Sequence, residues 1–465
     1  MDNFDVVVIG SGPGGYVSAI RSAQLGLKVA LVEQKALGGV CLNIGCIPSK
    51  ALLRNAELVY LLRTQAAEFG IHADNLTFDY GAAYKRSRQV SQRLTKGVGF
   101  LMKKNAIPII EGHGEIANPQ EVLVRAADGS SQSLATRQII LATGAHPTVV
   151  PGMEPDGEKI LDYEDAIMLQ KLPASIVVIG GGAVGVEFAT VWSAYGVDVH
   201  IVEMLPHILP AEDDEAAAEL TKAFTKRGVK VHAGTKVQAV QKTETGVQVQ
   251  IANESGAETL TAEAVLVAVG FKPNSSDLGL EKVGVAVDQR GFVQIDERMA
   301  TNVPGIWAIG DVTGKLLLAH TASAMGVICA ENIAGKPTRQ IDYRMIPRAT
   351  YTQPQVASFG YTEKQAREAG FSVRIGKFPF QANGKALGLG EPGGYIKLVA
   401  DEKNGQLLGA SLVGADVSEL LPELTLAQAN GLPVEAIARN IHAHPTLSEV
   451  VMEAAEAAEG HAIHL

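Results

Sequence analysis

Two stretches of the chain share one order of apolar strand, glycine-rich turn, helix and second strand. In the first, the apolar run FDVVVI at 4–9 predicts a strand buried on both faces, as in a parallel sheet. The turn GSGPGG follows at 10–15, then a helical stretch to about Leu25 and a second strand, LKVALVE, that ends at Glu33. This order predicts a βαβ unit of a Rossmann-like α/β domain.

The glycines of this unit have the spacing of a dinucleotide-binding turn. Gly10 allows the tight turn, Gly12 lets the backbone approach a pyrophosphate, and Gly15 lets the helix pack closely on the strand. The helix N-terminus then presents free N–H groups and its positive dipole end to the phosphates. Glu33 is placed to accept hydrogen bonds from an adenosine ribose.

The second stretch, SIVVIGGGAVGVEFATVWSAYGVDVHIVE at 175–203, repeats the pattern with Gly180, Gly182, Gly185 and Glu203. The acidic residue follows the first glycine by 23 residues in both stretches. Two unrelated glycine turns do not explain this matched spacing. The sequence therefore predicts two dinucleotide sites.

Each repeat closes with another apolar strand that ends in small residues. These strands are IILATGA, with Thr143 and Gly144, and AVLVAVGF, with Gly270. Small residues there allow the backbone to pass close to a cofactor, or simply make a tight strand exit. A later strand, in GIWAIGD, ends at Gly310 and Asp311, where the aspartate is also explained as a helix cap.

The pattern changes from about Ile341. Short strands, a KNGQ turn and a helix-rich end predict a separate α+β domain with an antiparallel sheet. The fold class is therefore α/β, with two Rossmann-like dinucleotide-binding domains and a C-terminal α+β domain. We place the domains at 1–150, 151–272 and 346–465, with 273–345 as a central segment that completes the first dinucleotide site.

The length and net charge of the chain exclude several classes of function. The 465 residues are enough for about three domains of ~150 residues each. A net charge of −10 and a pI near 5.6 argue against nucleic acid or an anionic membrane as partner. The start MDNFDVVVI lacks the features of a signal peptide, and no stretch approaches the ~20 apolar residues of a membrane span. We expect a cytoplasmic, reducing environment, where a cycling disulfide is compatible and a structural one unusual.

The segment GGVCLNIGCIPSK at 38–50 carries two of the three cysteines, Cys41 and Cys46. In a regular helix, residues five apart lie about 7.5 Å apart along the axis, beyond the roughly 4.4–6.8 Å Cα span of a disulfide. A bond therefore needs a bent or broken turn, which Gly45 permits, and Pro48 suits the first position of a following helix. Two buried apolar cysteines remain the other interpretation. A metal site is disfavoured because no second cysteine pair or nearby histidine completes four zinc ligands.

The segment IHAHPTLSEVVMEAAEAAE at 441–459 holds a second candidate group. The spacing from Thr446 to Glu449 satisfies a capping box, in which Glu449 only caps a helix. Alternatively, His444 is a base near neutral pH and Glu449 accepts its other N–H. These roles compete for one carboxylate, and the segment alone favours the cap.

Together these motifs resemble the pyridine nucleotide–disulfide oxidoreductases over nearly the whole chain, and within them the branch that oxidises dihydrolipoamide. The cysteine and histidine segments are the most specific. The resemblance implies FAD at the first fingerprint, NAD at the second, and a C-terminal dimerisation domain. The implied activity is oxidation of protein-bound dihydrolipoamide to lipoamide, with reduction of NAD⁺ to NADH.

The resemblance also implies roles for individual residues. Cys41 and Cys46 form the redox disulfide, with Cys41 exchanging with substrate and Cys46 beside the flavin. His444 is the base and Glu449 orients it. The remaining matches are Lys50 near flavin N5 with its partner Glu187; Gly10, Gly12, Gly15, Glu33, Lys50, Gly114, Thr143, Gly144, Gly310, Asp311 and Ala319 for FAD; and Gly180, Gly182, Gly185, Glu203, Val237 and Gly270 for NAD. Sequence alone would regard Lys50 and Glu187 as ordinary helix charges.

The implied assembly is a homodimer in which the partner subunit contributes its histidine base. The implied reaction partner is a lipoyl-bearing acyltransferase (E2) or a glycine-cleavage H protein. Three residues depart from the family pattern: Phe271 stands where Arg is frequent, Gln355 where Glu is usual, and Val40 where Thr is common. None touches the implied electron path.

Two other functions compete. A glutathione-reductase-like, NAD(P)H-dependent disulfide reductase is the alternative within the family. However, Glu203 is followed by Met204, Leu205 and Pro206, with no Arg or Lys to receive a 2′-phosphate, so NAD is favoured. A non-catalytic, flavin-bearing scaffold subunit is the alternative from another class, and the intact cysteine and histidine segments argue against it.

Overall fold

A parallel sheet forms the core of the N-terminal lobe. In the computed structural model, which describes residues 2–465, β1 (Asp2–Ile9) pairs with β2 (Val29–Glu33) on one side and β6 (Ser131–Leu141) on the other. Residues 6–8 are fully buried because both faces of the strand are covered. Helix α1 (Pro13–Gln24) connects β1 to β2. The predicted βαβ unit is confirmed.

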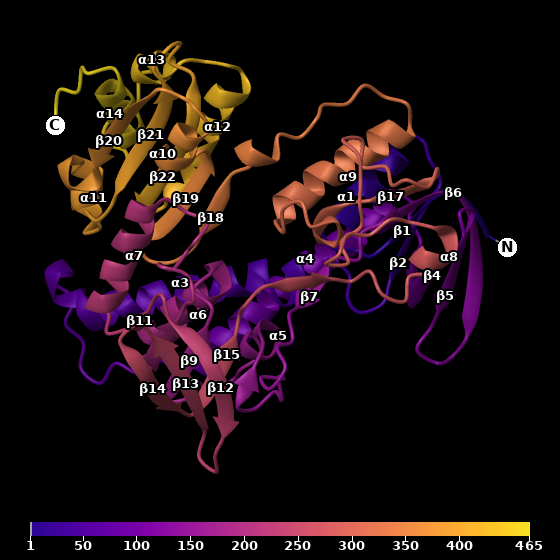
Figure 1. Ribbon diagram of the computed structural model, residues 1–465, viewed down its shortest axis with the longest axis horizontal. Helices are drawn as coiled ribbons and strands as arrows, with labels where there is room; N and C mark the ends of the chain where they lie inside the picture. Colours follow the sequence, from indigo (N-terminus) through magenta and orange to yellow (C-terminus); the bar gives the residue numbers. More distant parts are fainter. Residues whose placement is uncertain (1) are drawn as a thin grey trace.

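The N-terminal sheet has seven strands in the order β3-β2-β1-β6-β5-β4, with β17 paired to β6. Strand β17 comes from a much later part of the chain than the other six strands, after the second repeat. The other elements of this lobe are β3 (Ile109–Glu111), β4 (His113–Asn118), β5 (Glu121–Arg125), β17 (Ile306–Ala308), α8 (Leu280–Val283) and α9 (Ala319–Ile333). Helix α9 packs against α1 in this lobe (Figure 1).

The middle lobe repeats the parallel arrangement. Its sheet has the order β11-β10-β9-β15-β8, and α6 follows β9 as α1 follows β1. A three-stranded antiparallel sheet packs its apolar side on one face, while α6 covers the other. The elements are β8 (Ile160–Leu161), α5 (Tyr163–Ala166), β9 (Ser175–Ile179), α6 (Ala183–Ala194), β10 (Asp198–Val202), α7 (Asp214–Lys226), β11 (Lys230–His232), β12 (Lys236–Lys242), β13 (Val247–Asn253), β14 (Gly256–Ala262) and β15 (Ala264–Val267).

Two long helices join these lobes. Helix α4 (Tyr80–Lys104) is capped by Asp79, which accepts a hydrogen bond from the N–H of Ala82. Helix α3 (Cys46–Thr64) packs against both α4 and α6. The cysteine segment therefore lies between the two parallel sheets. The chain crosses between the lobes on the paired strands β7 (Ala145–Pro147) and β16 (Phe271–Pro273).

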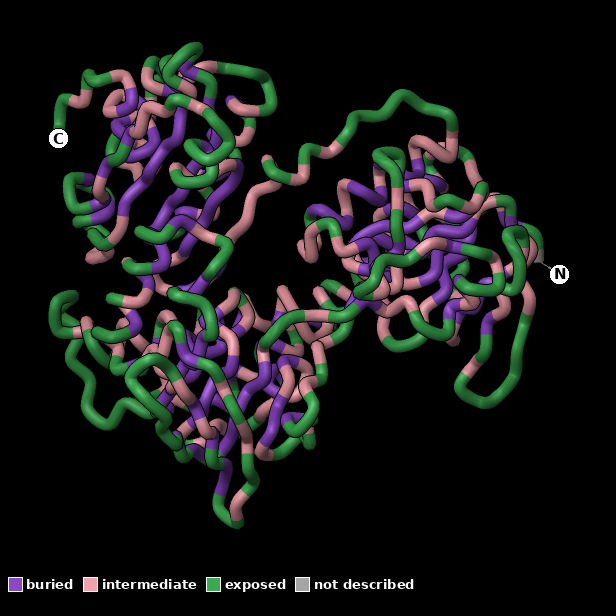
Figure 2. The backbone as a smooth tube through the Cα atoms, in the orientation of Figure 1, coloured by how far each residue is buried: buried purple, intermediate pink, exposed green. Residues whose placement is uncertain are grey.

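The C-terminal lobe is built on an antiparallel sheet in the order β18-β19-β22-β21-β20. Figure 1 shows it at the upper left, and an exposed strap at 335–340 leads to it from α9; in Figure 2 this strap is a green tube. Its elements are β18 (Arg348–Thr350), β19 (Gln355–Gly360), α10 (Glu363–Glu368), β20 (Val373–Pro379), α11 (Gly384–Leu389), β21 (Tyr395–Asp401), β22 (Leu407–Gly414), α12 (Leu421–Ala429), α13 (Val434–Ala438) and α14 (Glu449–Ala458). The predicted α+β domain is confirmed, and its limits at 346–465 stay a prediction. Across residues 2–465, no helix combines the length and apolarity that a membrane span needs.

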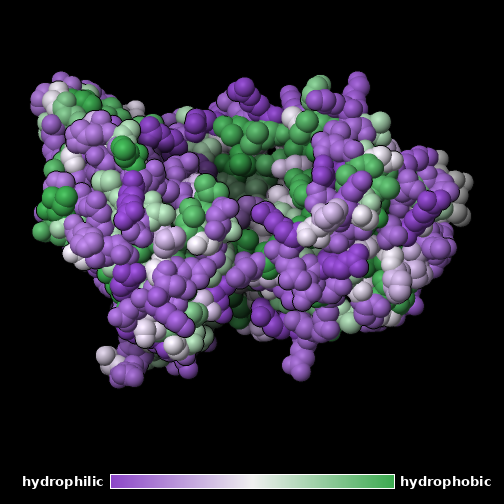
Figure 3. Space-filling view, turned by 90° about the horizontal axis from the view of Figure 1, so that it is seen from above, coloured by the Kyte–Doolittle hydropathy of each residue, from purple (hydrophilic) through white to green (hydrophobic). Residues whose placement is uncertain are grey.

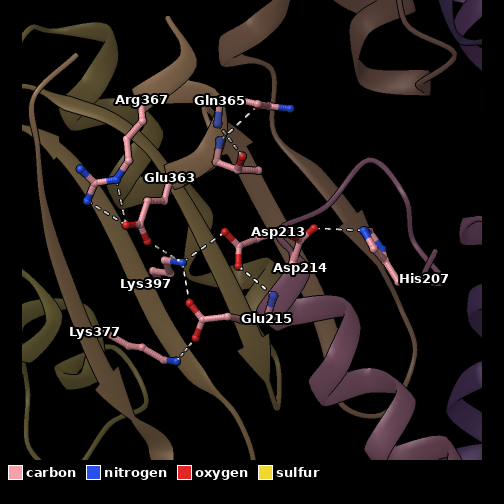
Figure 4. Close-up of polar contacts among 10 residues, drawn as sticks. His207, Asp213, Asp214, Glu215, Glu363, Gln365, Arg367, Lys377 and Lys397 are labelled. Atoms are coloured by element: carbon pink, nitrogen blue, oxygen red, sulfur yellow. Dashed lines mark hydrogen bonds and ion pairs between the residues drawn. The ribbon is translucent and has the colours of Figure 1, made fainter. Parts of the chain in front are cut away.

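A buried lysine joins the C-terminal lobe to the middle lobe. Lys397 on β21 is only 4% exposed, and its Nζ lies 3.3 Å from Asp213 Oδ2, 2.6 Å from Glu215 Oε1 and 3.1 Å from Glu363 Oε2 (Figure 4). Asp213 also caps α7 by accepting from the N–H of Glu215. Lys377 contacts the other oxygen of Glu215. The start of α7 is thus held against the C-terminal sheet by charge.

We expect Lys397→Met to lose about 3 kcal/mol of unfolding free energy, because the buried Asp213 carboxylate is left without its cation. Chemical denaturation of the purified protein measures this. Lys377→Met is the matched control: this lysine contacts the same Glu215 but is 42% exposed, so its loss should stay below about 1 kcal/mol. Equal losses in the two variants would mean that burial adds nothing to the lysine's contribution.

The difference between wild type and Lys397→Met should also shrink in acid. Burial raises the pKa of Glu215 and of Glu363, but the neighbouring Lys397, with Lys377 and Arg367, brings both below the ordinary value of 4.5. The folded state therefore holds these carboxylates charged at a pH where the unfolded chain protonates them. Their contribution to stability is complete above the unfolded pKa and is lost as the pH falls through the folded one.

Candidate active site

One cavity of about 1670 Å³ runs between the N-terminal and middle lobes. Ordinary small-molecule sites occupy roughly 300–1,000 Å³, so this cavity has room for more than one ligand. Both glycine turns and both cysteines of the 38–50 segment line it. Figure 3 shows one face of the molecule hollowed near its middle, with hydrophobic side chains around the hollow.

The three glycines of the first turn are needed for different reasons. Gly10 has φ +100°, and a Cβ there would lie 2.4 Å from the carbonyl oxygen of Ala142. A Cβ on Gly15 would lie 1.9 Å from the carbonyl oxygen of Gly10, so this glycine allows α1 to pack on the turn. Gly12 has open space at the same position, which leaves its backbone accessible from the cavity. The turn fits a pyrophosphate at the N-terminus of α1.

The second turn has the same geometry. Gly180 has φ +107° and its Cβ would lie 2.4 Å from the carbonyl oxygen of Ala268, while a Cβ on Gly185 would lie 2.1 Å from that of Gly180. Gly182 again faces open space. The equal spacing in the sequence therefore reflects two equivalent turns, both of which line the same cavity.

The acidic residues after the second strands are held by backbone groups. Glu33 Oε2 accepts from the N–H of Ser11 at 2.8 Å, and its Oε1 accepts from that of Lys35 at 2.7 Å. Glu203 does the same, with Gly181 N at 2.7 Å and Leu205 N at 2.8 Å. Each carboxylate is thus fixed at the cavity wall, where its outer lone pairs fit ribose hydroxyls.

Asp311 supports the assignment of the first site to a flavin nucleotide. It lies in a short 3₁₀ turn at Gly310–Thr313 and lines the cavity. Burial raises the pKa of Asp311 to about 6, and no group within residues 2–465 donates a hydrogen bond to its carboxylate. A half-buried carboxylate that faces the cavity without a protein donor fits a polyhydroxylated ligand such as the ribityl chain of FAD.

The cysteine segment folds as two helices with a break between them. Helix α2 (Gly39–Asn43) ends before Gly45, whose φ of −126° and ψ of −116° are not helical, and α3 begins at Cys46. This is the broken turn that the sequence predicts. The prediction for Pro48 is wrong in detail, because it is the third residue of α3 and not the first. Either place is tolerated, since N–H groups in the first turn have no partner within the helix.

The structure carries the two sulfurs as thiols. The hydrogen bond from Cys41 lowers the pKa of Cys46, and although burial opposes this, Lys50 lowers it further, to about 7. The same hydrogen bond, together with burial, raises the pKa of Cys41. Lys50, one helical turn after Cys46 on α3, therefore favours the thiolate at that sulfur.

Lys50 and Glu187 form an ion pair beside Cys46. Lys50 lies one turn after Cys46 on α3, and its Nζ is 3.0 Å from Glu187 Oε1 and 2.8 Å from Oε2. Burial alone would lower the pKa of Lys50, but Glu187 raises it overall. From the sequence alone, Lys50 and Glu187 are predicted to be two unrelated charges on separate helices. The fold makes them a pair that joins α3 to α6.

His444 and Glu449 form the second predicted group. His444 Nδ1 lies 2.8 Å from Glu449 Oε1, and the N–H of Thr446 donates to Oε2 at 2.7 Å. Burial would raise the pKa of Glu449, but these two contacts lower it. Only half of the predicted capping box forms: Glu449 accepts from the N–H of Thr446, but α14 begins at Glu449 itself and the Thr446 hydroxyl donates to Ala443 instead of capping the helix. The two roles do not compete, since each uses its own carboxylate oxygen.

The predicted residues fall into three groups. Those that line the cavity are Cys41, Cys46, Lys50, Glu187, Gly10, Gly12, Glu33, Gly114, Thr143, Gly144, Gly310, Asp311, Ala319, Gly180, Gly182, Glu203, Val237 and Gly270. Gly15 and Gly185 lie behind it as packing positions. His444 and Glu449 lie in the C-terminal lobe, and the His444 side chain is 80% exposed within one chain.

Of the three residues that depart from the family pattern, two line the cavity and one lies in the C-terminal lobe. Phe271 lines the cavity with its ring 5.7 Å from that of Tyr163, and Val40 lines it beside Cys41. Gln355 accepts from the N–H of Ser418 within the C-terminal lobe. Sequence reasoning also missed Tyr351, which contacts both Lys50 and Glu187 and belongs to none of the motifs recognised in the chain.

Comparison with known families agrees with this geometry. Residues 4–326 match the family described as pyridine nucleotide-disulphide oxidoreductase, and residues 346–455 match the dimerisation domain of that family. The chain is 52% identical over 465 residues to dihydrolipoyl dehydrogenase of Mycobacterium tuberculosis, covering 100% of both chains. It is 47% identical to the protein of that name from Corynebacterium glutamicum, covering 100% of this chain and 99% of the other.

Solved structures give the same picture. The crystal structure of LpdA from Mycobacterium tuberculosis matches with a TM-score of 0.91 at 28% identity, covering 98% of this chain and 99% of that one. The Cu(II) complex of the HOCl-induced flavoprotein disulfide reductase RclA from Escherichia coli matches with a TM-score of 0.87 at 29% identity, with the same coverage.

Proposed function

Because the chain belongs to the pyridine nucleotide-disulphide oxidoreductase family, we propose that it oxidises protein-bound dihydrolipoamide to lipoamide and reduces NAD⁺ to NADH. One observation carries this function: a close cysteine pair with a lysine–glutamate ion pair lies in a cavity between two dinucleotide turns. Full-length relatives at 44–52% identity share the name dihydrolipoyl dehydrogenase.

The cofactors are FAD at the turn of Gly10 and NAD at the turn of Gly180. Bound there, FAD would supply the chemistry that sulfur and nicotinamide lack, because a flavin can exchange an electron pair with a dithiol and a hydride with NAD⁺. Asp311 and Glu33 would hold the first nucleotide, and Glu203 would hold the ribose of the second. Glu203 is followed by no basic side chain, so its carboxylate favours NAD over NADP.

The first half-reaction is an exchange of disulfides. One dihydrolipoyl thiol gives its proton to His444, and the resulting thiolate attacks Sγ of Cys41, so that the Cys41–Cys46 bond breaks and Cys46 leaves as a thiolate. The second substrate thiol then attacks the substrate sulfur of the mixed disulfide. Its proton passes to Cys41, which leaves as a thiol, and lipoamide is released. The electron pair now lies on the two cysteines.

The electrostatics of the site suit this order. Attack requires a thiolate, and His444 takes the proton at Nε2 because its Nδ1 is engaged by Glu449. Cys46 is the better leaving group, since its pKa is lowered to about 7 while that of Cys41 is raised. This agrees with the roles that the family resemblance implies, in which Cys41 exchanges with substrate and Cys46 would lie beside the flavin.

The working unit is a homodimer, as expected from the dimerisation domain at 346–455. His444 is not among the residues of 2–465 that line the cavity, and it is largely exposed within one chain. We infer that it acts on the cysteines of the partner subunit. An isolated subunit would then lack the base.

We further infer that the substrate is presented by a lipoyl-bearing acyltransferase or by a glycine-cleavage H protein, in the cytoplasm. A reducing compartment suits a cysteine pair that cycles between disulfide and thiols. Affinity capture with the purified holoenzyme, followed by identification of the lipoylated protein retained, distinguishes these two substrates.

The direct test is turnover by the FAD-loaded enzyme. Dihydrolipoamide with NAD⁺ should give NADH, and NADP⁺ should be a poor substitute. Preferential reduction of glutathione disulfide by NADPH would instead support a glutathione-reductase-like enzyme. A protein that binds FAD but neither turns over nor shows thiolate-to-flavin charge-transfer absorbance on anaerobic reduction would be a scaffold.

A further inference from the structure

The ion pair beside Cys46 is contacted by a third residue from another lobe. Tyr351 directly follows β18, at the start of the C-terminal lobe. The Nζ of Lys50 lies 4.6 Å from the centroid of the Tyr351 ring. The backbone N–H of Tyr351 donates to Glu187 Oε1 at 3.0 Å. One residue thus touches both members of the pair.

We propose that Tyr351 is a positioning residue, whose ring and N–H hold the Lys50 ammonium beside Cys46 from the C-terminal lobe. The proposal deepens the proposed function and rests on its assignment of Cys46 as the sulfur that faces the flavin. It adds a residue that no cysteine, histidine or glycine motif of the chain contains.

The two parts of Tyr351 have different roles: its backbone N–H holds the Glu187 carboxylate, and its ring holds the Lys50 ammonium. Glu187 is only 11% exposed, and both its oxygens accept from Lys50, while Oε1 also accepts from Tyr351. This fixes the carboxylate. The lysine has a long, flexible stem, and the aromatic face attracts the ammonium by cation–π interaction. The ring itself is held, because it packs on the apolar core between α3 and α6.

The position of the ammonium matters because opposing charges face Cys46. The Cys41 thiol donates to it from α2, Lys50 lowers its pKa from α3, and Glu187 raises it from α6. Lysine and glutamate act in opposite directions, so their relative distances decide the balance. Without the Tyr351 ring, the Lys50 ammonium would be free to follow the Glu187 carboxylate away from Cys46. It would then stabilise the Cys46 thiolate less.

The test is a pH titration of the long-wavelength charge-transfer band in the reduced, FAD-loaded enzyme. Tyr351→Leu removes the ring, and the midpoint should rise by about half a pH unit, a threefold change in the thiolate equilibrium. Tyr351→Phe keeps the ring and should titrate as wild type. Tyr351→Met is a second ring-free variant, which keeps the test valid if the leucine variant does not fold.

The matched control is Tyr361→Leu. Arg344 lies 4.1 Å from the centroid of the Tyr361 ring, a cation–π contact that lies outside the cavity lining. Its loss should leave the titration unchanged. An unchanged midpoint in both ring-free variants, or an equal shift in Tyr351→Phe, would overturn the proposal.

A second readout separates this proposal from the proposed function. In a Cys41→Ser background, the pH dependence of iodoacetamide alkylation reports the pKa of Cys46 without turnover, and Tyr351→Leu should shift it upward by the same amount. If this shift is found but the enzyme with both cysteines intact does not oxidise dihydrolipoamide, the proposed substrate is refuted and Tyr351 remains a positioning residue. If the enzyme with both cysteines intact turns over normally but the pKa of Cys46 does not shift, the proposed function stands and the role of Tyr351 is refuted.

Discussion

Cys41→Ser is expected to lose dihydrolipoamide oxidation by at least about a thousandfold, while the protein keeps its long-wavelength absorbance. The exchange step needs a sulfur at position 41, and serine cannot form the mixed disulfide. Cys46 remains as a thiolate, and the serine hydroxyl can still donate the hydrogen bond that lowers its pKa. The band should therefore be present in the purified variant and should strengthen as the pH rises through about 7. Steady-state turnover and a visible spectrum measure the two properties.

Cys46→Ser is the matched variant for the other sulfur. It should lose turnover as completely and should also lose the band, because no thiolate faces the flavin. If Cys41→Ser lost the band and Cys46→Ser kept it, the roles of the two sulfurs would be reversed. FAD content should be equal in both variants, since neither cysteine belongs to the glycine turns that hold the nucleotide.

His444→Gln should slow the dithiol half-reaction by about 10²–10⁴-fold, the usual contribution of a positioned base. Glutamine has a similar length but cannot accept the thiol proton. NADH oxidation by an artificial acceptor should change less than about twofold, because it does not require thiol deprotonation. Rapid-mixing measurements of the two half-reactions test this, and equal losses in both would remove His444 from the role of base.

Two further variants refine the His444 test. Glu449→Gln keeps an acceptor for His444 Nδ1 but removes the charge that stabilises the protonated ring, so a smaller loss of about tenfold is expected. His464→Gln is the control, because His464 forms a similar pair with Glu453, at 2.6 Å, on the same helix. It should leave both half-reactions unchanged.

The sequence by itself determined the parts of the site that depend on short stretches of backbone. A turn that needs φ near +100° or a contact that excludes Cβ can only be made by glycine, so Gly10, Gly15 and Gly180 identify both dinucleotide turns. Gly45, at the break between α2 and α3, is a milder case, because its φ is −126° and a Cβ there would lie 3.1 Å from the carbonyl oxygen of Val40. These geometries are local, and the residues that make them are adjacent in the chain.

Only the tertiary structure decided the groups whose members are distant in the chain. Lys50 and Glu187 belong to helices of different lobes, and Tyr351 reaches them from a third. Lys397 meets Asp213 across another interface, and β17 returns to the first sheet from beyond the second repeat. Taken singly, each of these residues looks like an ordinary surface charge or core aromatic. Periodicity and spacing describe one element at a time, whereas burial and charge pairing depend on which faces of separate elements come together.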